Sequence, residues 1–388
     1  MAMEGLLRGD GDSAYAQGFF GVEKVFLKKQ SKIMDFPHLH TVIMAGGAGV
    51  RFWPASTQAK PKQFLDILGC GETLLQATYR RARHLCPPTQ IWVVTNAEYV
   101  PTVLEQLPEL QSANVVGEPA KRNTGPCLML ASALVERIDP LAEMLVLPSD
   151  HHIGNEGAFY RSVEEGVEYA QTREVLLTFG VRPHRAETGY GYIEVERDAR
   201  RDFLPVERFH EKPDAATAKR YVGKGNFFWN SGMFAWQNRV FRDSMARWQP
   251  ALAEKFAPLE GGYSQGVVEQ IYGAIEPVSI DYALLELAGN VEVLPVDFAW
   301  SDLGAWQSVY EYLPKDALGN ATQGSAVLLG TSNCLVSAPE GQLIVAKGLE
   351  NYAVIQTEKS TLICPITESE EMRRITAILG EKGYDDHL

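Results

Sequence analysis

Residues 41–66 read TVIMAGGAGVRFWPASTQAKPKQFLD, and the rest of the chain is best interpreted outward from them. The apolar run at 41–44 predicts a buried strand, which passes at once into Gly46, Gly47 and Gly49. Glycine has no Cβ, so a polyanion can approach the main-chain N–H groups of such a turn closely. The stretch therefore predicts a strand that ends in a phosphate-binding loop.

Two common glycine-rich loops do not fit this stretch. A P-loop ends in Gly-Lys followed by Ser or Thr, but Arg51 and Phe52 stand at those positions. The dinucleotide-binding fingerprint fits Gly47 and Gly49 but meets Phe52 where its third glycine belongs. What remains is a glycine turn followed by two cations, Arg51 and Lys62, which suits charged oxygens. On these residues alone, a plain turn with two surface cations stays an alternative.

The run GGAGVRFWPAS at 46–56, followed by Pro-Lys-Gln-Phe at 61–64, resembles the signature of sugar-nucleotide pyrophosphorylases. Its Phe-Trp-Pro-x-Ser and Lys-Gln-Phe details are similar to those of mannose-1-phosphate guanylyltransferases. The resemblance extends from Thr41 to the C-terminus. It implies binding of GTP and mannose 1-phosphate, with nucleotide contacts at Ala45, Gly46, Gly47, Gly49, Arg51 and Lys62.

Composition narrows the class of partner. A formal net charge of −13 argues against a nucleic-acid-binding surface, which needs a basic face to displace counterions. The 5 cysteines are odd in number and form no C-x-x-C pair, a pattern typical of a reducing cytoplasm. No apolar run approaches the length of a membrane span. We expect a cytoplasmic protein without nucleic-acid or membrane partners.

Alternating strand and helix patterns follow the lysine of residue 62. A helix is expected to begin at Glu72–Thr73, and the apolar run at 91–95 is typical of a central parallel strand. This order predicts a doubly wound, Rossmann-like α/β mixed sheet of the nucleotidyltransferase type. Short β-rich pieces from Ser325 onward predict a small C-terminal β-helix-like domain, whose exposed end coil favours a homodimer.

Three regions are expected along the chain. Residues 1–36 are interpreted as a disordered N-terminal extension, residues 37–320 as the catalytic domain, and residues 321–388 as the β-helix-like domain.

The loop from Glu118 to Pro126 lies between a predicted strand and a predicted helix, where doubly wound sheets bind ligands. Asn123 and Thr124 also fit the plainer role of helix caps. The resemblance implies that Glu118, Arg122, Asn123 and Thr124 bind the base and ribose. Gly125 stands where many relatives have alanine, and we expect little consequence.

Asp150 follows the predicted strand MLVLPS, and Asp302 lies in the block Trp-Ser-Asp-Leu-Gly-Ala-Trp. A turn former at Asp150 and a helix cap at Asp302 are the plainer alternatives. The resemblance implies that both carboxylates bind Mg²⁺, which prefers hard oxygen ligands, with Asp297 a less favoured ligand. No zinc-like spacing surrounds His151 and His152, so we interpret both as structural.

Glycines and aromatic residues dominate 182–236, which predicts hairpins forming a lid-like subdomain over the sheet edge. The resemblance implies that Gly191, Glu211 and Asn230 hold sugar hydroxyls and that Lys212 meets the sugar phosphate. Glu211 and Lys212 are adjacent, so both can face one ligand only if the strand end twists or bulges. The segment from Asp281 is interpreted only as the start of a packing helix.

The implied reaction is GTP plus mannose 1-phosphate giving GDP-mannose plus diphosphate. The nucleophile is an already ionised phosphate oxygen, so catalysis reduces to positioning and charge neutralisation. The catalytic residues implied by the resemblance are Arg51, Lys62, Asp150, Lys212 and Asp302. Two alternatives remain: transfer to another sugar or from another base, including heptose, thymidylyl and adenylyl types, and a non-catalytic regulatory subunit that senses sugar nucleotides.

Overall fold

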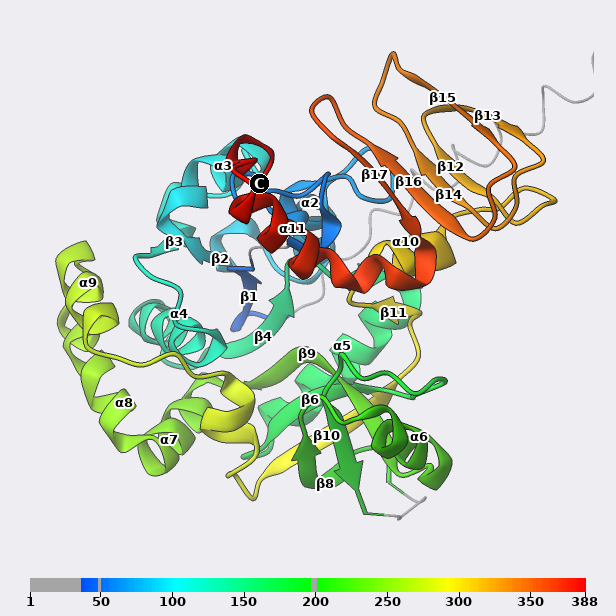
Figure 1. Cartoon of the computed structure of the whole chain (residues 1–388). Coiled ribbons are helices and arrows are strands. Elements are labelled where there is room, and N and C mark those ends of the chain that lie inside the picture. The colour runs from blue at the N-terminus through cyan, green and yellow to red at the C-terminus, as the bar shows by residue number, and fades with distance from the viewer. Residues whose placement is uncertain (1–35, 48–49, 197–200) are drawn as a thin grey trace, which may run out of the picture. The chain divides into compact units, whose positions relative to one another are not determined.

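The computed structural model describes residues 36–47, 50–196 and 201–388, and its central feature is a nine-stranded sheet (Figure 1). The strands lie in the order β3-β2-β1-β4-β9-β6-β10-β8-β7. Their bounds are β1 (Leu39–Ala45), β2 (Ile91–Asn96), β3 (Val115–Glu118), β4 (Glu143–Pro148), β6 (Leu176–Val181), β7 (Tyr192–Val195), β8 (Leu204–His210), β9 (Phe227–Gln237) and β10 (Val291–Val296).

Strand direction fixes where the loops meet. Strands β3, β2, β1 and β4 are mutually parallel, and β6 is parallel to β10. Strand β9 lies antiparallel between β4 and β6, so β6 and β10 run in the same direction as β4. The carboxyl ends of these parallel strands therefore share one edge, as the doubly wound prediction requires.

The expectation of a lid over the sheet edge for 182–236 was wrong for its C-terminal part, which forms β9. Strand β9 lies in the middle of the sheet, and its Phe228, Phe234 and Trp236 belong to the main hydrophobic core. The segment also contains an unexpected helix, α6 (Ala215–Lys224), capped by Asp214. The aromatic residues of this segment therefore serve largely as core.

Helices cover both faces of the sheet. On one face, α2 and α3 pack against Ile43 and Val93, and on the other, α4 and α7 pack against Val42 and Val94. Consecutive residues of β1 are thus buried on opposite sides, which explains its continuous apolar sequence. The helices are α2 (Leu74–Leu85), α3 (Val100–Gln106), α4 (Thr124–Ile138), α5 (Glu156–Gln171), α7 (Asn238–Trp248), α8 (Pro250–Phe256), α9 (Gln265–Gly273), α10 (Trp306–Tyr312) and α11 (Met372–Glu381).

Two helix starts test the sequence predictions. Helix α2 begins after Thr73 with a capping box, in which Thr73 Oγ1 accepts from Gln76 N and Gln76 Oε1 accepts from Thr73 N. The predicted start is confirmed. Helix α10 begins after Ala305 without a side-chain cap, so the capping role considered for Asp302 is wrong.

The C-terminal residues form smaller sheets. Strands β12, β14 and β16 pair in parallel, β17 lies antiparallel on β16, and β13 pairs in parallel with β15. A further short pair, β5 (His152–Ile153) and β11 (Trp300–Ser301), joins the ends of two loops. The C-terminal strands are β12 (Ala321–Gln323), β13 (Ser325–Leu329), β14 (Leu335–Ser337), β15 (Leu343–Lys347), β16 (Tyr352–Gln356) and β17 (Thr361–Pro365).

Helix α11, which the sequence interpretation missed, follows these strands and packs near the turn Val50–Phe52. Trp53 Nε1 donates a hydrogen bond to the carbonyl oxygen of His387 at 2.7 Å, and Trp306 Nε1 donates to the carbonyl oxygen of Trp53 at 3.1 Å. Phe52 and Trp53 share one hydrophobic cluster with residues of β14, β16 and α11. The C-terminal residues therefore support the segment that follows the glycine turn.

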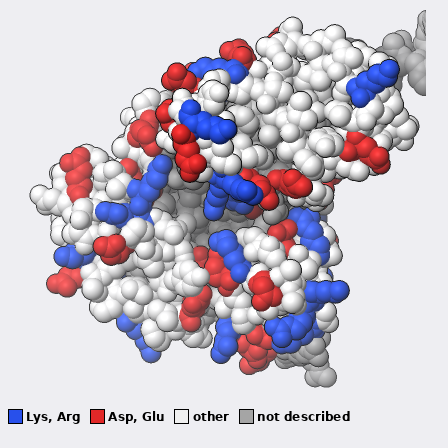
Figure 2. Space-filling model, viewed as in Figure 1, with Lys and Arg blue, Asp and Glu red and all other residues white. Residues whose placement is uncertain are grey.

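The predicted N-terminal extension lies, except for Phe36, outside the described residues. Across the part of the chain that is described, no helix has the length and apolarity needed to cross a membrane. Figure 2 shows cations and anions interspersed over the face in view.

Candidate active site

The glycine turn follows β1 and is held by side chains from neighbouring segments. Gln63 Nε2 donates hydrogen bonds to the carbonyl oxygens of Ala45 and Gly47, each at 3.0 Å. Thr95 Oγ1 donates to the same Ala45 oxygen at 2.8 Å. These bonds occupy the carbonyls of the turn from within the protein. Gly46 and Gly47 line a hollow at the carboxyl edge of the sheet, whereas Gly49 lies outside the described residues.

Lys62 is the buried cation of this edge, with a relative exposure of 4%. Its Nζ lies 2.8 Å from Asp150 Oδ2 and donates to the carbonyl oxygens of Asp302 at 2.7 Å and Leu303 at 3.3 Å. It also lies 5.7 Å from the centroid of the Phe52 ring. One ammonium group thus ties together the two segments that carry the predicted metal ligands.

Asp150 and Asp302, the two predicted metal ligands, each have a partner within the protein through one carboxylate oxygen. Burial alone would raise the pKa of Asp150, but Lys62, His151 and Arg51 outweigh it and hold the pKa below its usual value. Asp302 Oδ1 accepts a hydrogen bond from the Tyr190 hydroxyl at 2.7 Å. Burial, together with Asp302, raises the pKa of Tyr190, so this hydroxyl keeps its proton and donates.

Arg51 reaches the same place from the segment after the glycine turn. A Cβ added at Gly304 would lie 3.1 Å from Asp302 Oδ2 and 3.4 Å from Arg51 Nη1, so the main chain at Gly304 passes close to both groups. The structure therefore brings Arg51, Lys62, Asp150 and Asp302 together, although they are far apart in the sequence.

His151 has a fixed orientation. Its Nδ1 accepts a hydrogen bond from Trp300 Nε1 at 3.1 Å, so a neutral ring carries its proton on Nε2. Burial outweighs the nearby carboxylates and lowers its pKa, which favours that neutral form. His152, in contrast, packs edge-on against Tyr312. The two histidines do not act as a pair.

A hollow of about 370 Å³ extends from the glycine turn to the start of α4, and its wall contains most of the predicted nucleotide contacts. Its lining includes Met44, Gly46, Gly47, Asn96, Glu118, Lys121, Arg122, Asn123, Thr124, Cys127, Pro148, Ser149, Asp150, His151 and Gly232. We call it the nucleotide hollow.

Glu118, the last residue of β3, is 5% exposed. The Tyr272 hydroxyl donates to its Oε1 at 2.9 Å, and a Cβ at Gly46 would lie 3.6 Å from its Oε2. Burial, only partly offset by Tyr272, raises the pKa of Glu118 to about 7. No Lys or Arg forms an ion pair with this carboxylate anywhere in 36–47, 50–196 or 201–388.

The loop that opens α4 is joined to a distant segment by three hydrogen bonds. Val278 N donates to the carbonyl oxygen of Arg122 at 3.1 Å, and Gly125 N donates to that of Val278 at 3.0 Å. Ile280 N donates to Thr124 Oγ1 at 2.8 Å. We call residues 278–280 the strap. Asn123 Oδ1 accepts from Thr124 N, so the predicted capping role is confirmed for Asn123.

The expectation that glycine has little consequence at position 125, where many relatives have alanine, stays a prediction. A Cβ at Gly125 would lie 2.8 Å from the main-chain oxygen of Val278, closer than such contacts normally allow. The strap, as it lies in this structure, leaves no room for a Cβ at position 125.

A second hollow, of about 200 Å³, adjoins the first and contains most of the predicted sugar contacts. Its lining includes Met44, Thr124, His151, Gly189, Tyr190, Gly191, Glu211, Asn230, Ser231, Gly232, Phe234, Ile280, Asp281, Trp300 and Asp302. We call it the sugar hollow. The sequence interpretation missed Tyr190 and Asp281, and it assigned His151 no place in either hollow.

Lys212 lies outside the lining of the sugar hollow, to which the resemblance assigned it. Strand β8 ends at His210, and Lys212 has a φ of 41°, so the main chain turns sharply after the strand. This turn allows the Lys212 ammonium to form an ion pair with Glu211, although the two residues are adjacent. Lys212 is 63% exposed in its side chain and is absent from the lining of the sugar hollow.

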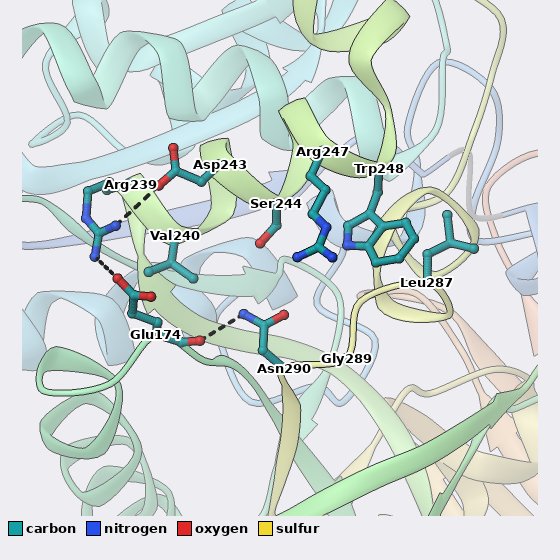
Figure 3. A pocket seen from close by; sticks show the side chains of 10 residues that line it. All are labelled: Glu174, Arg239, Val240, Asp243, Ser244, Arg247, Trp248, Leu287, Gly289 and Asn290. Atoms are coloured by element: carbon teal, nitrogen blue, oxygen red, sulfur yellow. Dashed lines mark hydrogen bonds and ion pairs between the residues drawn. The ribbon is translucent and has the colours of Figure 1, made fainter.

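The opposite edge of the sheet has a larger hollow, of about 490 Å³ (Figure 3). It lies where β6 and β10 begin, and Arg239 there pairs with both Glu174 and Asp243. Asn290 Nδ2 donates to the carbonyl oxygen of Glu174. The charge of Arg239 is thus matched within the hollow, and none of the predicted site residues lines it. We therefore take the carboxyl edge, despite its smaller hollows, as the candidate active site.

Comparisons with known proteins agree on the family. Residues 40–318 match the nucleotidyl transferase family profile. The chain is 35% identical to a mannose-1-phosphate guanylyltransferase of Escherichia coli, covering 89% of this chain and 75% of the relative. It is equally similar, at 35%, to the xanthan biosynthesis protein XanB of Xanthomonas campestris pv. campestris (strain B100), covering 89% and 74%.

A solved structure has the same fold over most of the chain. It is described as mannose-1-phosphate geranyltransferase from Thermus thermophilus and superposes with a TM-score of 0.81 at 31% identity. The alignment covers 88% of this chain and 99% of that one.

Proposed function

The chain belongs to the nucleotidyl transferase family, and we propose that it transfers the guanylyl group of GTP to mannose 1-phosphate. A phosphate oxygen of the sugar phosphate attacks the α-phosphorus of GTP, and the bond from that phosphorus to the β,γ-diphosphate breaks. The products are GDP-mannose and diphosphate. No proton has to move, because the attacking oxygen is ionised at neutral pH.

The observation that carries this proposal is the wall shared by the two hollows. Met44, Thr124, His151 and Gly232 line both of them. A nucleotide in one hollow and a sugar phosphate in the other would therefore lie next to each other at these shared residues. Asp150 belongs to the lining of the first, Asp302 to that of the second, and Lys62 contacts both residues. Transfer of a nucleotidyl group between two bound anionic substrates depends on such an arrangement, because the reacting groups must be held close together.

Glu118 supports the choice of guanine. The Watson–Crick edge of guanine presents two adjacent N–H donors, and a carboxylate offers two matching acceptors. Adenine presents a ring acceptor at the corresponding place, which would face the carboxylate with like polarity. A buried acidic side chain without a cationic partner among the described residues is therefore well suited to select GTP.

We assign the remaining predicted residues to charge neutralisation and substrate binding. Residues Ala45, Gly46, Gly47 and Gly49 and the guanidinium of Arg51 hold the β- and γ-phosphates. Lys62 braces the α-phosphate after exchanging its contact with Asp150. Lys212, on its flexible stem at the rim, meets the sugar phosphate. Arg122, Asn123 and Thr124 hold the ribose, and Gly191, Glu211 and Asn230 hold sugar hydroxyls.

The carboxylates fit the magnesium ion that the resemblance implies. Asp150 and Asp302 each use one oxygen for a partner within the protein, and each has further lone pairs. No group of three or more His, Cys, Asp or Glu suited to a metal ion occurs among the described residues. Mg²⁺ is commonly held by one or two carboxylates and completes its shell with water and substrate phosphates. When bound, it would offset the negative charge gathered at the reacting phosphates.

We also propose the domain organisation given by residues 37–320 and 321–388, with the parallel strands β12 to β16 as a short β-helix. The outer face of β13 and β15 exposes Val327, Leu329, Leu343 and Val345 by 44 to 61%. Such an apolar patch supports a homodimer through this region. All five cysteines are free thiols, which supports a cytoplasmic location.

The test is diphosphate release by the purified protein with Mg²⁺, mannose 1-phosphate and each of the four nucleoside triphosphates. We expect release with GTP and its loss in Asp302→Ala. Release of similar size with another triphosphate would contradict the guanine assignment, and release with another sugar 1-phosphate would contradict the mannose assignment. Absence of release with every sugar phosphate would favour the regulatory alternative.

A further inference from the structure

Asp281 is a carboxylate of the sugar hollow that lies outside every motif discussed above. It is the first residue of a π-helical turn, Asp281–Leu285, and it follows the strap directly. Single π-helical turns are frequent at functional sites. Because the strap is hydrogen-bonded to the loop of the nucleotide hollow, the position of Asp281 is fixed relative to both hollows.

Asn230 connects Asp281 to the predicted sugar contacts. Its Nδ2 donates to Asp281 Oδ1 at 2.7 Å, and its Oδ1 accepts from Gly232 N at 3.1 Å. Its main-chain N donates to the carbonyl oxygen of Gly191 at 2.9 Å. The amide orientation of Asn230 is therefore determined, and one N–H of that amide remains for a ligand.

The two carboxylates of this hollow differ in their charge balance. Glu211 forms an ion pair with Lys212. Asp281 has no Lys or Arg partner within the described ranges, and its contacts there are hydrogen bonds from neutral groups. Burial and the nearby Glu211 raise its pKa, and hydrogen bonds from Asn230 and Ser279 only partly offset this. Burying a carboxylate without a cationic partner costs free energy unless hydrogen-bond donors surround it. Because Asp281 lines the sugar hollow, a ligand in that hollow can supply a further donor.

We propose that Asp281 is a specificity-determining residue that accepts a hydrogen bond from a sugar hydroxyl next to the one held by Glu211. This inference rests on the proposed function. Neighbouring hydroxyls of a pyranose are donors a few ångströms apart, and two acceptors from separate segments can distinguish their arrangement. A site built to accept a hydroxyl rejects an analogue without it, because the acceptor is then left unpaired.

Asp281→Asn is the informative substitution. It preserves size and can still accept from Asn230, but it turns the remaining oxygen into a donor. Glu286→Gln is the matched control, because Glu286 is an exposed carboxylate just after the same turn and does not line the sugar hollow. Both variants are compared with the unaltered protein by thermal unfolding before kinetics.

The experiment measures kcat/KM for mannose 1-phosphate and for its 2-, 3-, 4- and 6-deoxy analogues, at saturating GTP. We expect Asp281→Asn to lower kcat/KM for mannose 1-phosphate roughly 10- to 100-fold, the usual scale for a hydrogen bond to a charged group, and to leave the KM for GTP within about twofold. One deoxy analogue should lose activity in the unaltered protein and suffer no further loss in the variant.

A merely structural role predicts a different pattern. If every deoxy analogue carries the same penalty in the variant as in the unaltered protein, Asp281 touches no hydroxyl and the inference is wrong. An equal loss in Glu286→Gln would also overturn it, because the effect would then come from charge alone. If the unaltered protein, folded and binding GTP, turns over no mannose 1-phosphate, it is the proposed function that fails.

Discussion

The nucleotide hollow and the sugar hollow are built in different ways. The first lies at the ends of parallel strands, and its glycine turn and α4 loop are held largely through main-chain groups. The second is assembled largely from the loop before β7, the turn after β8, strand β9 and the π-helical turn at Asp281, which are separated widely in sequence.

This difference follows from what each hollow would bind. Phosphates can be recognised by main-chain N–H groups, which every sequence has, so the specific requirement is only that side chains stay out of the way. Hydroxyl groups of a sugar require acceptors and donors at particular points, and those come from side chains such as Glu211, Asn230 and Asp281. A local sequence motif can specify the first kind of site but not the second.

Lys62→Met should have the largest effect, because Lys62 belongs to the boundary between the hollows. We expect kcat to fall on the order of 10²- to 10³-fold, with both substrates still bound, since one charge-stabilising donor is lost near the reacting phosphates. Stopped-flow or steady-state diphosphate release measures this. Lys60→Met, an exposed lysine two residues away, is the control and should retain full activity. If Lys62→Met keeps a kcat within threefold of that of the unaltered protein, Lys62 does not stabilise the reacting phosphates.

Glu118→Gln should affect the nucleotide side alone. It replaces one of two acceptors by a donor, so kcat/KM for GTP should fall about 10²-fold while the KM for mannose 1-phosphate changes little. Competition among the four triphosphates measures the selectivity, which should relax. Unchanged preference for GTP would show that another residue selects the base.

Gly125→Ala should disturb both hollows, because the added Cβ presses on the strap that joins them. We expect a loss of about 1 to 3 kcal/mol in the free energy of unfolding, the usual cost of overpacking, and a higher KM for both substrates. Chemical denaturation and steady-state kinetics measure these quantities. The control is Gly223→Ala in α6, where a Cβ meets no atom within 4 Å and stability should be unchanged or slightly higher. A rise in KM for only one of the two substrates would contradict the idea that the strap supports both hollows.

The smallest effect should be a pH dependence of kcat/KM for GTP. Because burial raises the pKa of Glu118 to about 7, the ionised form that accepts from guanine increases as the pH rises from 6 to 8. The ratio of kcat/KM for GTP between the unaltered protein and Glu118→Gln should therefore rise by less than about tenfold over this range. Taking the ratio cancels the ionisation of GTP itself. A flat ratio would contradict a titrating carboxylate.

The raised pKa of Glu118 also predicts that the free energy of unfolding changes with pH. The folded state holds the Glu118 proton more tightly than the unfolded chain, whose pKa is near 4.5. The contribution of Glu118 to the free energy of unfolding therefore decreases as the pH rises through the window from about 4.5 to 7, by about 3 kcal/mol in total, and is constant above it. Glu118→Gln should be the more stable protein at pH 8.

The sequence predicted the local structure around those candidate site residues that directly follow strand ends. Gly46, Gly47 and Asp150 each come just after an apolar run, and both the doubly wound sheet and the start of α2 were predicted correctly. These features depend on local periodicity and on residues close to one another in the chain.

The rest depends on contacts between distant segments. Nothing near Asp281 indicates that Asn230, 51 residues away, would meet its carboxylate. Likewise, Gly125 looks replaceable until Val278 is placed against it, and β9 looks like a hairpin until its aromatic residues are seen in the core. Helix α11 was missed because the repeating strands before it suggested continued β structure.

The support of the glycine turn by the C-terminal residues has a consequence for biosynthesis. Trp53 and His387, which are hydrogen-bonded, are separated by 334 residues. At ribosomal rates of about 5 to 20 residues per second, the segment after the turn waits roughly 15 to 70 s for its partner to be made. During that interval Trp53 lacks the C-terminal part of its packing. Newly made chains therefore gain the mature surroundings of their phosphate-binding segment only after His387 has emerged from the ribosome.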